Sequence, residues 1–225
     1  MSLTLYAHPL SSYCWKVLAA LYENGTPFEM AVLSPDNPEA GAEFARLWPV
    51  GKFPLLKDSA RDRVVPESTI IIDYLDQHYP GPVKLIPEDR DAARQVRLAD
   101  RFYDLHVHHH MQRIVNDLLR PAGDKDPTGV AEARAKLDVA YDMIEADMSA
   151  KTGASRTGAS KTWAAGDAFS LADCAAGPAL FYGNLQHPIG ESRPSTLAYL
   201  KRLTERPGLA RAMKESEPFM HMVPR

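Results

Sequence analysis

Cysteine is scarce in this sequence, because Cys14 and Cys174 are the only two among 225 residues and neither belongs to a Cys-x-x-Cys pair. Two isolated cysteines argue against a disulfide scaffold and suit a reducing cytosol. Apolar runs of the roughly 20 residues that a transmembrane helix needs are also missing. The first residues carry no basic region and soon enter a predicted strand, so no signal peptide is expected. We therefore expect a cytoplasmic protein without a membrane partner.

A surplus of positive charge is missing as well. The chain holds 26 Lys and Arg against 29 Asp and Glu, which gives a formal net charge of -3. Surfaces that bind nucleic acid are strongly basic, so we expect no nucleic-acid partner. The apolar content of 45% and the charged content of 24% are ordinary for a globular protein, and the length allows one domain or two small ones.

The first 80 residues or so predict alternating strands and helices. Apolar residues at helical spacing in 12–22 and 68–78 predict two helices, and a shorter helical pattern lies near 43–47. Alternating and β-branched stretches predict strands at 3–7, 28–32, within 51–58 and at 63–65. The order βαβ followed by ββα predicts a mixed sheet covered by helices.

The segment 80–91, with three prolines and a glycine, separates this region from one that is helical throughout. One apolar stripe predicts a long helix over 90–120, and further helices are expected at 131–148, 171–182, 196–206 and 208–214. The helix over 171–182 is apolar on nearly every side, which predicts a central position. Between two of these helices, the small polar segment 149–162 repeats TGAS and predicts a mobile loop.

Two serines, a tyrosine and a cysteine stand where the first strand passes into the first helix. Ser11 and Ser12 can cap that helix. The same position also offers free N–H groups and a positive dipole end, which attract an anion such as a thiolate, and a hydroxyl there can donate a hydrogen bond to it. Cys14 has no cysteine partner and stands beside Trp15, so we expect it to pack as a small apolar residue.

Three further patterns are candidates for binding. A cis bond before Pro54 would turn the preceding backbone toward an extended ligand, although X–Pro bonds are usually trans. Glu67 and Ser68 stand at a helix entrance, where they can cap the helix or help it to hold a carboxylate. The histidines of "HVHHH" share helical spacing, yet no carboxylate stands at matching spacing, so we expect no metal site among His106, His109 and His110.

Taken in order, "SSYCWKV", "GKFPLL" and "PESTIIIDYL", followed by an all-helical half, resemble the cytosolic glutathione transferases over nearly the whole chain. "SLADC" at 170–174 is similar to the capping box of the family, in which Ser170 and Asp173 would exchange hydrogen bonds. The resemblance implies a thioredoxin-like, glutathione-binding N-terminal domain over 1–80, a linker over 81–90 and a helical-bundle C-terminal domain over 91–225.

The resemblance also implies residue roles. Ser11 matches the serine that activates the glutathione thiol in theta- and zeta-like members, with Ser12 or Tyr13 as alternative donors. The remaining glutathione-binding residues would be Lys52 for a carboxylate, Phe53 and Pro54 for the cysteinyl backbone, and Glu67 and Ser68 for the γ-glutamyl end. The candidate electrophile-lining positions are Tyr103, His106, Val107, His110 and Met111.

The function implied is a glutathione transferase, which activates the thiol for attack on a small hydrophobic electrophile and needs no tightly bound cofactor beyond glutathione as co-substrate. Two alternatives stay open. One is a glutathione-dependent isomerase resembling maleylacetoacetate isomerase, although zeta-like members carry Ser-Ser-Cys-Ser where this chain has Ser11-Ser12-Tyr13-Cys14. The other is a non-catalytic binding or assembly module with the same fold. Beta-like members carry a cysteine where this chain has Leu10, so mixed-disulfide chemistry is not expected.

The family also pairs two-fold, so the resemblance implies a homodimer. Apolar contributors from the first domain would be Phe44, Leu47 and Trp48, with Arg94 and Arg97 of the long helix as polar partners.

Overall fold

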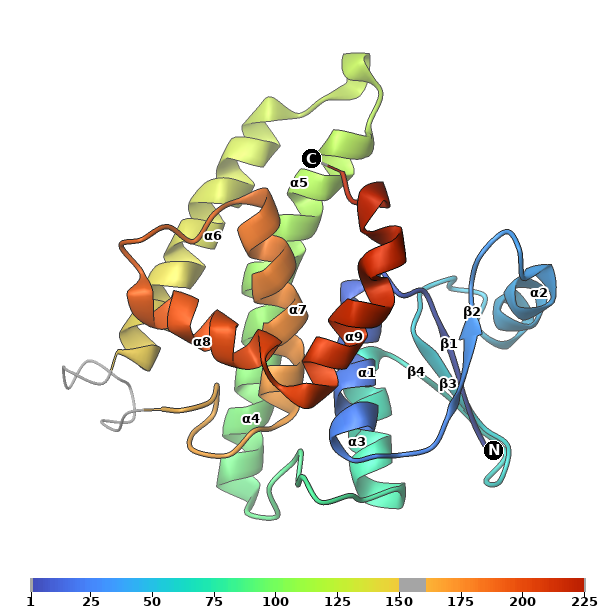
Figure 1. The fold of residues 1–225 in the computed structure, drawn as a ribbon. Coiled ribbons are helices and arrows are strands. Elements are labelled where there is room, and N and C mark those ends of the chain that lie inside the picture. The colour runs from blue at the N-terminus through green and yellow to red at the C-terminus, as the bar shows by residue number, and fades with distance from the viewer. Residues whose placement is uncertain (1, 150–160, 225) are drawn as a thin grey trace. The chain divides into compact units, whose positions relative to one another are not determined.

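The computed structural model describes residues 2–149 and 161–224, and its course is traced in Figure 1. Contacts divide the chain into two units. The first runs to Ile86 and takes in Pro207–His221, and the second comprises Pro87–Arg206 with the residues from Met222 onward. The division after Ile86 falls inside the predicted linker. The final segment differs from the prediction, because Pro207–His221 was assigned to the helical domain and instead packs within the first unit.

The first unit is built on a four-stranded mixed sheet in the order β2-β1-β3-β4. Strand β1 is parallel to β2 and antiparallel to β3, and β3 is antiparallel to β4. This is the predicted thioredoxin-like arrangement. Its elements are β1 (Leu3–Ala7), α1 (Ser12–Glu23), β2 (Glu29–Val32), α2 (Pro38–Leu47), β3 (Leu55–Asp58), β4 (Arg63–Pro66), α3 (Ser68–His78), α9 (Pro207–Ser216) and the 3-10 helix η3 (Glu217–Met222).

Helices α1 and α3 lie on one face of this sheet and α2 lies on the other (Figure 1). On the α2 side, Tyr6, Phe44 and Leu55 form an apolar cluster. Phe44 is 7% exposed, so the residue that we expected at a subunit surface belongs to this core. Burial of these apolar side chains is the main force that holds α2 to the sheet.

Helix α9 packs against α1. The Tyr22 hydroxyl donates to the Glu215 carboxylate at 2.5 Å, and the Gly208 N–H donates to the Glu23 carboxylate at 2.8 Å. A Cβ at position 208 would lie 2.7 Å from the Ala19 carbonyl oxygen, so glycine permits this close approach. The last helix thus closes the outer side of α1.

The second unit is helical among its described residues. Helix α7 is its centre, as predicted, since residues 171–180 are all buried and α7 contacts α4, α5 and α8. The elements are α4 (Arg90–Phe102), the π-helix η1 (Tyr103–His108), α5 (His109–Leu119), the 3-10 turn η2 (Ala122–Asp124), α6 (Pro127–Met148), α7 (Leu171–Gln186) and α8 (Pro194–Thr204). The two TGAS repeats, at 152–155 and 157–160, lie outside the described residues.

Several helices begin earlier than predicted because prolines start them. Helix α6 begins at Pro127 rather than at Ala131, and α2 begins at Pro38. Proline suits the first turn of a helix, where its missing N–H would have no partner in any case. Ahead of α6, the Asp126 carboxylate caps the helix by accepting the Gly129 N–H at 2.7 Å.

The predicted long helix over 90–120 is one continuous helical path with a change of winding in its middle. Helices α4 and α5 are joined by the π-helix η1. The wider turn shifts the side-chain register, and it leaves Asp104 and His108 buried. Apolar periodicity alone does not reveal such a change, although π-turns occur often at functional sites.

The carboxylate of Asp173 joins three segments of the second unit. It accepts the Ser170 N–H at 2.9 Å, which completes the predicted capping box. It also accepts the Ala164 N–H at 2.8 Å and the Tyr199 hydroxyl at 2.6 Å. Burial raises the pKa of Asp173, and these donors oppose that effect by favouring its charged form. One buried carboxylate therefore ties α8 and the segment before α7 to the start of α7.

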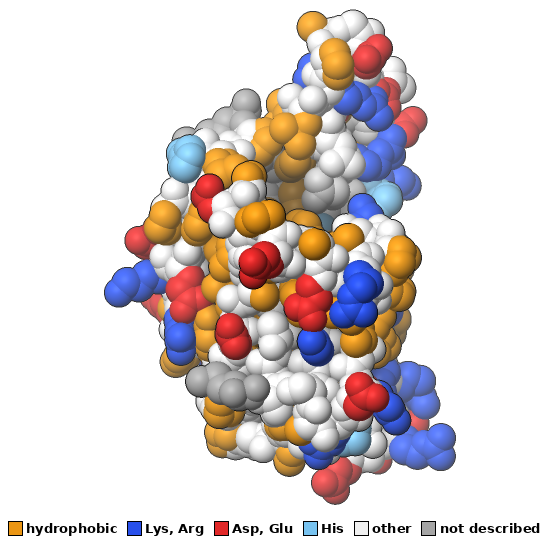
Figure 2. Space-filling view, turned by 90° about the vertical axis from the view of Figure 1, so that its right-hand side faces the viewer, with side chains coloured by type: hydrophobic (Ala, Val, Ile, Leu, Met, Phe, Trp, Pro, Cys, Tyr) orange, Lys and Arg blue, Asp and Glu red, His pale blue; other side chains and the backbone are white. Residues whose placement is uncertain are grey.

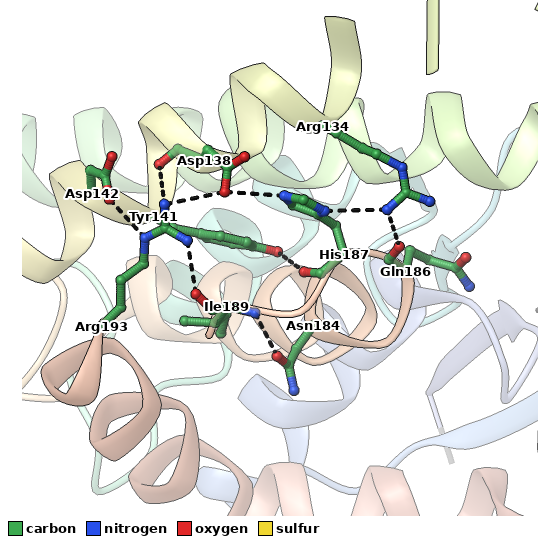
Figure 3. Close-up of polar contacts among 9 residues, drawn as sticks. All are labelled: Arg134, Asp138, Tyr141, Asp142, Asn184, Gln186, His187, Ile189 and Arg193. Carbon is green, nitrogen blue, oxygen red and sulfur yellow. Dashed lines mark hydrogen bonds and ion pairs between the residues drawn. The ribbon is translucent and has the colours of Figure 1, made fainter. Parts of the chain in front are cut away.

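A polar cluster fastens the segment between α7 and α8 to α6 (Figure 3). The Asp138 carboxylate lies 3.1 Å from His187 Nε2, and Arg134 Nη1 lies 3.2 Å from His187 Nδ1. Because arginine only donates, Nδ1 is the acceptor of this contact. Arg193 adds an ion pair to Asp138 at 3.1 Å, and its guanidinium lies over the Tyr141 ring.

Charges of both signs are interspersed on the face of the molecule shown in Figure 2, among scattered hydrophobic side chains. None of the helices in the described ranges combines the length and the apolar character that crossing a bilayer requires.

Replacing Tyr199 by phenylalanine should destabilise the protein, because the buried Asp173 carboxylate would lose one donor. A hydrogen bond to a charged group contributes about 1.5–3 kcal/mol, and urea unfolding should show a loss in that range. The control is Tyr141→Phe, which removes a hydroxyl that donates to the neutral His187 carbonyl and should cost about 0.5–1.5 kcal/mol. Equal losses in the two variants would contradict the role given to Asp173.

Candidate functional site

Three segments that carry predicted site residues meet at one edge of the sheet. Leu55 at the start of β3 pairs with Tyr6 near the end of β1 and with Pro66 at the end of β4. The chain therefore enters or leaves all three strands at this edge. The segments brought together are 8–13, 52–54 and 67–68.

The turn from β1 to α1 places Ser11 as the N-cap of α1. Its Oγ accepts the Cys14 N–H at 3.3 Å, and its own N–H donates to the His8 carbonyl at 2.9 Å. Capping, one of the two roles that we considered for Ser11, is thus present. A hydroxyl has two acceptor positions and one donor, so capping leaves its proton to donate elsewhere. Ser11, Ser12 and Tyr13 are all partly exposed at the helix start.

Cys14 is fully buried in α1 and unpaired with the other cysteine. Burial raises the pKa of its thiol to about 11, against the lowering effects of the Ser11 side chain and the His8 backbone. The thiol is therefore protonated at neutral pH and inaccessible, as expected for a packed residue.

The peptide bond between Phe53 and Pro54 is cis. Pro54 is buried immediately before β3, whereas Phe53 is 39% exposed and its ring packs against Phe44 with centroids 6.4 Å apart. Lys52 is exposed just ahead of them. This segment therefore offers a backbone edge and a cation at the same end of the sheet.

Glu67 holds an unusual backbone conformation between β4 and α3. Its φ of 69° lies in a region that non-glycine residues rarely adopt and that costs about 1–3 kcal/mol. Glu67, rather than Ser68, is the N-cap of α3, and its side chain makes no capping hydrogen bond within the described structure. Ser68 is the first helical residue and is 7% exposed. The start of α3 thus presents helix N–H groups suited to an anion.

Lys16 is a neighbour of this helix start that the sequence analysis missed. Its side chain is 1% exposed, and its Nζ donates to Thr69 Oγ1 at 2.8 Å. It links α1 to the first turn of α3 and brings a cation there. The sequence feature that could have identified Lys16 is its place inside the apolar run of α1, because burying a charge there is costly unless it has partners.

The five predicted electrophile positions differ in exposure. Val107 and Met111 are buried at 0% and 3%, His106 is exposed and His110 is partly exposed. Burial lowers the pKa of His110, with smaller contributions from His109 and Arg113. Their assignment stays a prediction. Over residues 2–149 and 161–224, no group of three or more His, Cys, Asp or Glu side chains is arranged to hold a metal ion.

A cavity of about 560 Å³ lies within the second unit, between α4, α6 and the segment 161–167. Its lining is largely apolar, with Lys161 Nζ lying 3.6 Å from the Asp147 carboxylate at one wall. Of the predicted electrophile positions, Tyr103 alone contributes to this lining among the described residues.

Comparison with known families agrees with this architecture. The glutathione S-transferase N-terminal domain matches residues 5–83, and the glutathione S-transferase C-terminal domain matches residues 102–207. The second match ends at the first residue of α9, the helix that packs in the first unit.

Individual relatives extend over nearly the whole chain. A probable maleylacetoacetate isomerase of Vibrio cholerae is 30% identical over 97% of this chain and 98% of its own. The glutathione S-transferase GstB of Escherichia coli is 24% identical over 94% of this chain and 97% of its own. The glutathione transferase URE2P8 of Phanerochaete chrysosporium, solved with oxidized glutathione, superposes with a TM-score of 0.82 at 20% identity, covering 98% of this chain and 97% of its own. Fold, domain matches and full-length relatives together assign this chain to the cytosolic glutathione S-transferase family.

Proposed function

We propose that this protein is a glutathione transferase that uses glutathione as co-substrate and acts on a small hydrophobic electrophile. The observation that carries the proposal is the meeting, at one edge of the sheet, of the Ser11 turn, the cis Phe53–Pro54 segment and the strained start of α3. An extended tripeptide with two carboxylates and one thiol needs separate anchors for its ends and its middle. This edge supplies them in three neighbouring segments.

Each anchor suits one part of glutathione. The N–H groups at the start of α3, with the Ser68 hydroxyl and the Glu67 carboxylate, suit the charged γ-glutamyl end. The backbone of Phe53 suits the cysteinyl part, and Lys52 suits the remaining carboxylate. The Ser11 hydroxyl then donates a hydrogen bond to the sulfur, where the positive end of α1 also favours a thiolate. Ser12 and Tyr13 are the alternative donors.

In the proposed reaction the protein stabilises a nucleophile that belongs to its substrate. The thiol of glutathione releases its proton, and the thiolate forms a carbon–sulfur bond with the electrophile while a leaving group departs or a double bond takes up the electron pair. The protein contributes alignment and thiolate stabilisation, and it forms no covalent intermediate. Cys14 and Cys174 are both buried and form no disulfide, which suits this chemistry in a reducing cytoplasm.

A glutathione-dependent isomerase is the second candidate, favoured by the full-length likeness to a probable maleylacetoacetate isomerase. In an isomerase the thiolate adds to a double bond and is then expelled, so that glutathione is regenerated. Mass spectrometry of the product distinguishes the two, because only a transferase leaves glutathione attached. Failure to turn over aryl halides, epoxides or maleylacetoacetate would instead favour a non-catalytic binding module.

Ser11→Ala should raise the pKa of bound glutathione by about one to two units, which corresponds to the loss of one charge-assisted hydrogen bond of about 1.5–3 kcal/mol. Ultraviolet absorbance of the thiolate as a function of pH measures this value. Ser11→Thr is the matched control, because it keeps both the cap and the donor. An unchanged pKa in Ser11→Ala, with a shift in Ser12→Ala or Tyr13→Phe, would transfer the role to that residue.

Ser68→Ala should raise the KM for glutathione more than it lowers kcat, because the proposed contact binds the ground state and the transition state equally. Steady-state kinetics with glutathione as the varied substrate measures the difference. Ser59→Ala, on the exposed turn after β3, is the control and should leave both constants unchanged. A fall in kcat at saturating glutathione with unaltered KM would contradict the binding role.

We also propose a homodimer, supported by exposed apolar side chains on neighbouring helices of the second unit. Leu98 of α4 is 55% exposed, Leu105 of η1 is 47% exposed and Val139 of α6 is 57% exposed. Light scattering at micromolar concentration should give about twice the chain mass of 24.9 kDa. A single-chain mass that persists in concentrated, active samples would refute this.

A further inference from the structure

The turn between β1 and α1 is organised around one histidine. The Leu10 N–H donates to His8 Nδ1 at 3.2 Å, and the Ser11 N–H donates to the His8 carbonyl at 2.9 Å. Trp15 Nε1 donates to the Pro9 carbonyl at 2.6 Å and fixes the turn from its buried side. His8 thus accepts hydrogen bonds from two consecutive backbone amides. Its side chain accepts from Leu10, and its carbonyl accepts from Ser11, the N-cap of α1.

This arrangement specifies the protonation state of the ring. A histidine nitrogen accepts a hydrogen bond only when the ring is neutral, so Nδ1 is bare and the proton is on Nε2. Burial lowers the pKa of His8, which keeps the ring neutral at pH 7. Protonation would place a donor at Nδ1 against the Leu10 N–H donor, and the turn would lose that hydrogen bond.

A residue from the far end of the chain holds the ring. Phe219 of η3 meets His8 edge to face, with ring centroids 5.4 Å apart and planes at 68°. Burial, rather than a neighbouring charge, is the cause of the lowered pKa of His8. The ionisable residues on the neighbouring segments are Tyr13, Cys14, Lys16, Tyr22 and Glu23 on α1, Lys52 ahead of β3, and Glu217 and His221 on η3.

We propose that His8 is a positioning residue, which places the Ser11 hydroxyl by holding the turn ahead of α1 through a neutral Nδ1. The consequence for catalysis rests on the proposed role of Ser11 in thiolate stabilisation. The His8 side chain does not touch glutathione in this proposal, because it acts through the Leu10 amide, next to Ser11 in the chain. Protonation of His8 therefore lowers kcat/KM at acid pH. This fall is an acid limb of the pH profile that is separate from the titration of the glutathione thiol.

Two substitutions test this role. His8→Asn keeps an acceptor in the place of Nδ1 but does not titrate, whereas His8→Leu keeps the bulk and removes the acceptor. We expect His8→Leu to lower kcat/KM about three- to tenfold, the effect of one neutral hydrogen bond, and His8→Asn to stay within about twofold of the wild type at pH 7. His8→Asn should also lose the acid limb ascribed to His8. His221→Asn, an exposed histidine on η3, is the control and should keep that limb.

Amide hydrogen exchange tests the same role without reference to activity. The Leu10 amide should be protected in the wild type at pH 7 and lose protection below the pKa of His8. In His8→Leu the Leu10 amide should be unprotected both at pH 7 and at the lower pH. In His8→Asn it should be protected at both. Equal protection in all three proteins would overturn the positioning role. A wild type without glutathione turnover, but with the expected exchange pattern, would overturn the proposed function and leave the role of His8 in the turn supported.

Discussion

The pairing of β3 with both β1 and β4 is the constraint on which the candidate site depends. Because β3 is antiparallel to each neighbour, its first residue stands beside the end of one strand and the end of the other. The segment 8–13, which lies about 40 residues before 52–54 in sequence, thereby shares one edge with 52–54 and 67–68. A one-residue slip of β3 would turn Leu55 away from its cluster with Tyr6 and Phe44 to the other face of the sheet, so the packing that forms this core also fixes the site.

The sequence predicted the parts of this structure that depend on local patterns. The capping box of Ser170 and Asp173 follows from two residues at fixed spacing, and the central position of α7 follows from its apolar surface. The early starts of α2 and α6 were missed because proline ends some helices and begins others, and only the preceding cap distinguishes the two cases. The π-helix η1 was missed because the four-residue spacing of Ala99, Tyr103, Val107 and Met111 also occurs on one face of an ordinary α-helix.

The residues of the candidate site also fall into two groups, those that local sequence patterns identified and those that they did not. Ser11, Pro54 and Ser68 were identifiable because each stands at the boundary of an element. The positive φ of Glu67 was not, because tertiary structure imposes it on a residue with no preference for it. His8 and Lys16 were missed because their importance lies in what they contact, an amide two residues away and Thr69 in another helix. Neither contact has a sequence pattern of its own.

The packing of α9 on α1 has a consequence for the order in which the chain can fold. The first unit needs residues from both ends of the sequence, whereas nearly all of the second unit lies in one continuous stretch between them. During synthesis, the residues up to Ile86 emerge first. More than a hundred further residues must be made before α9 can cover α1. The side of α1 that packs against α9 therefore stays uncovered on the ribosome until α9 has been made, although α3 can already pack against α1. Nearly all residues of the second unit are available before those of the first unit are complete.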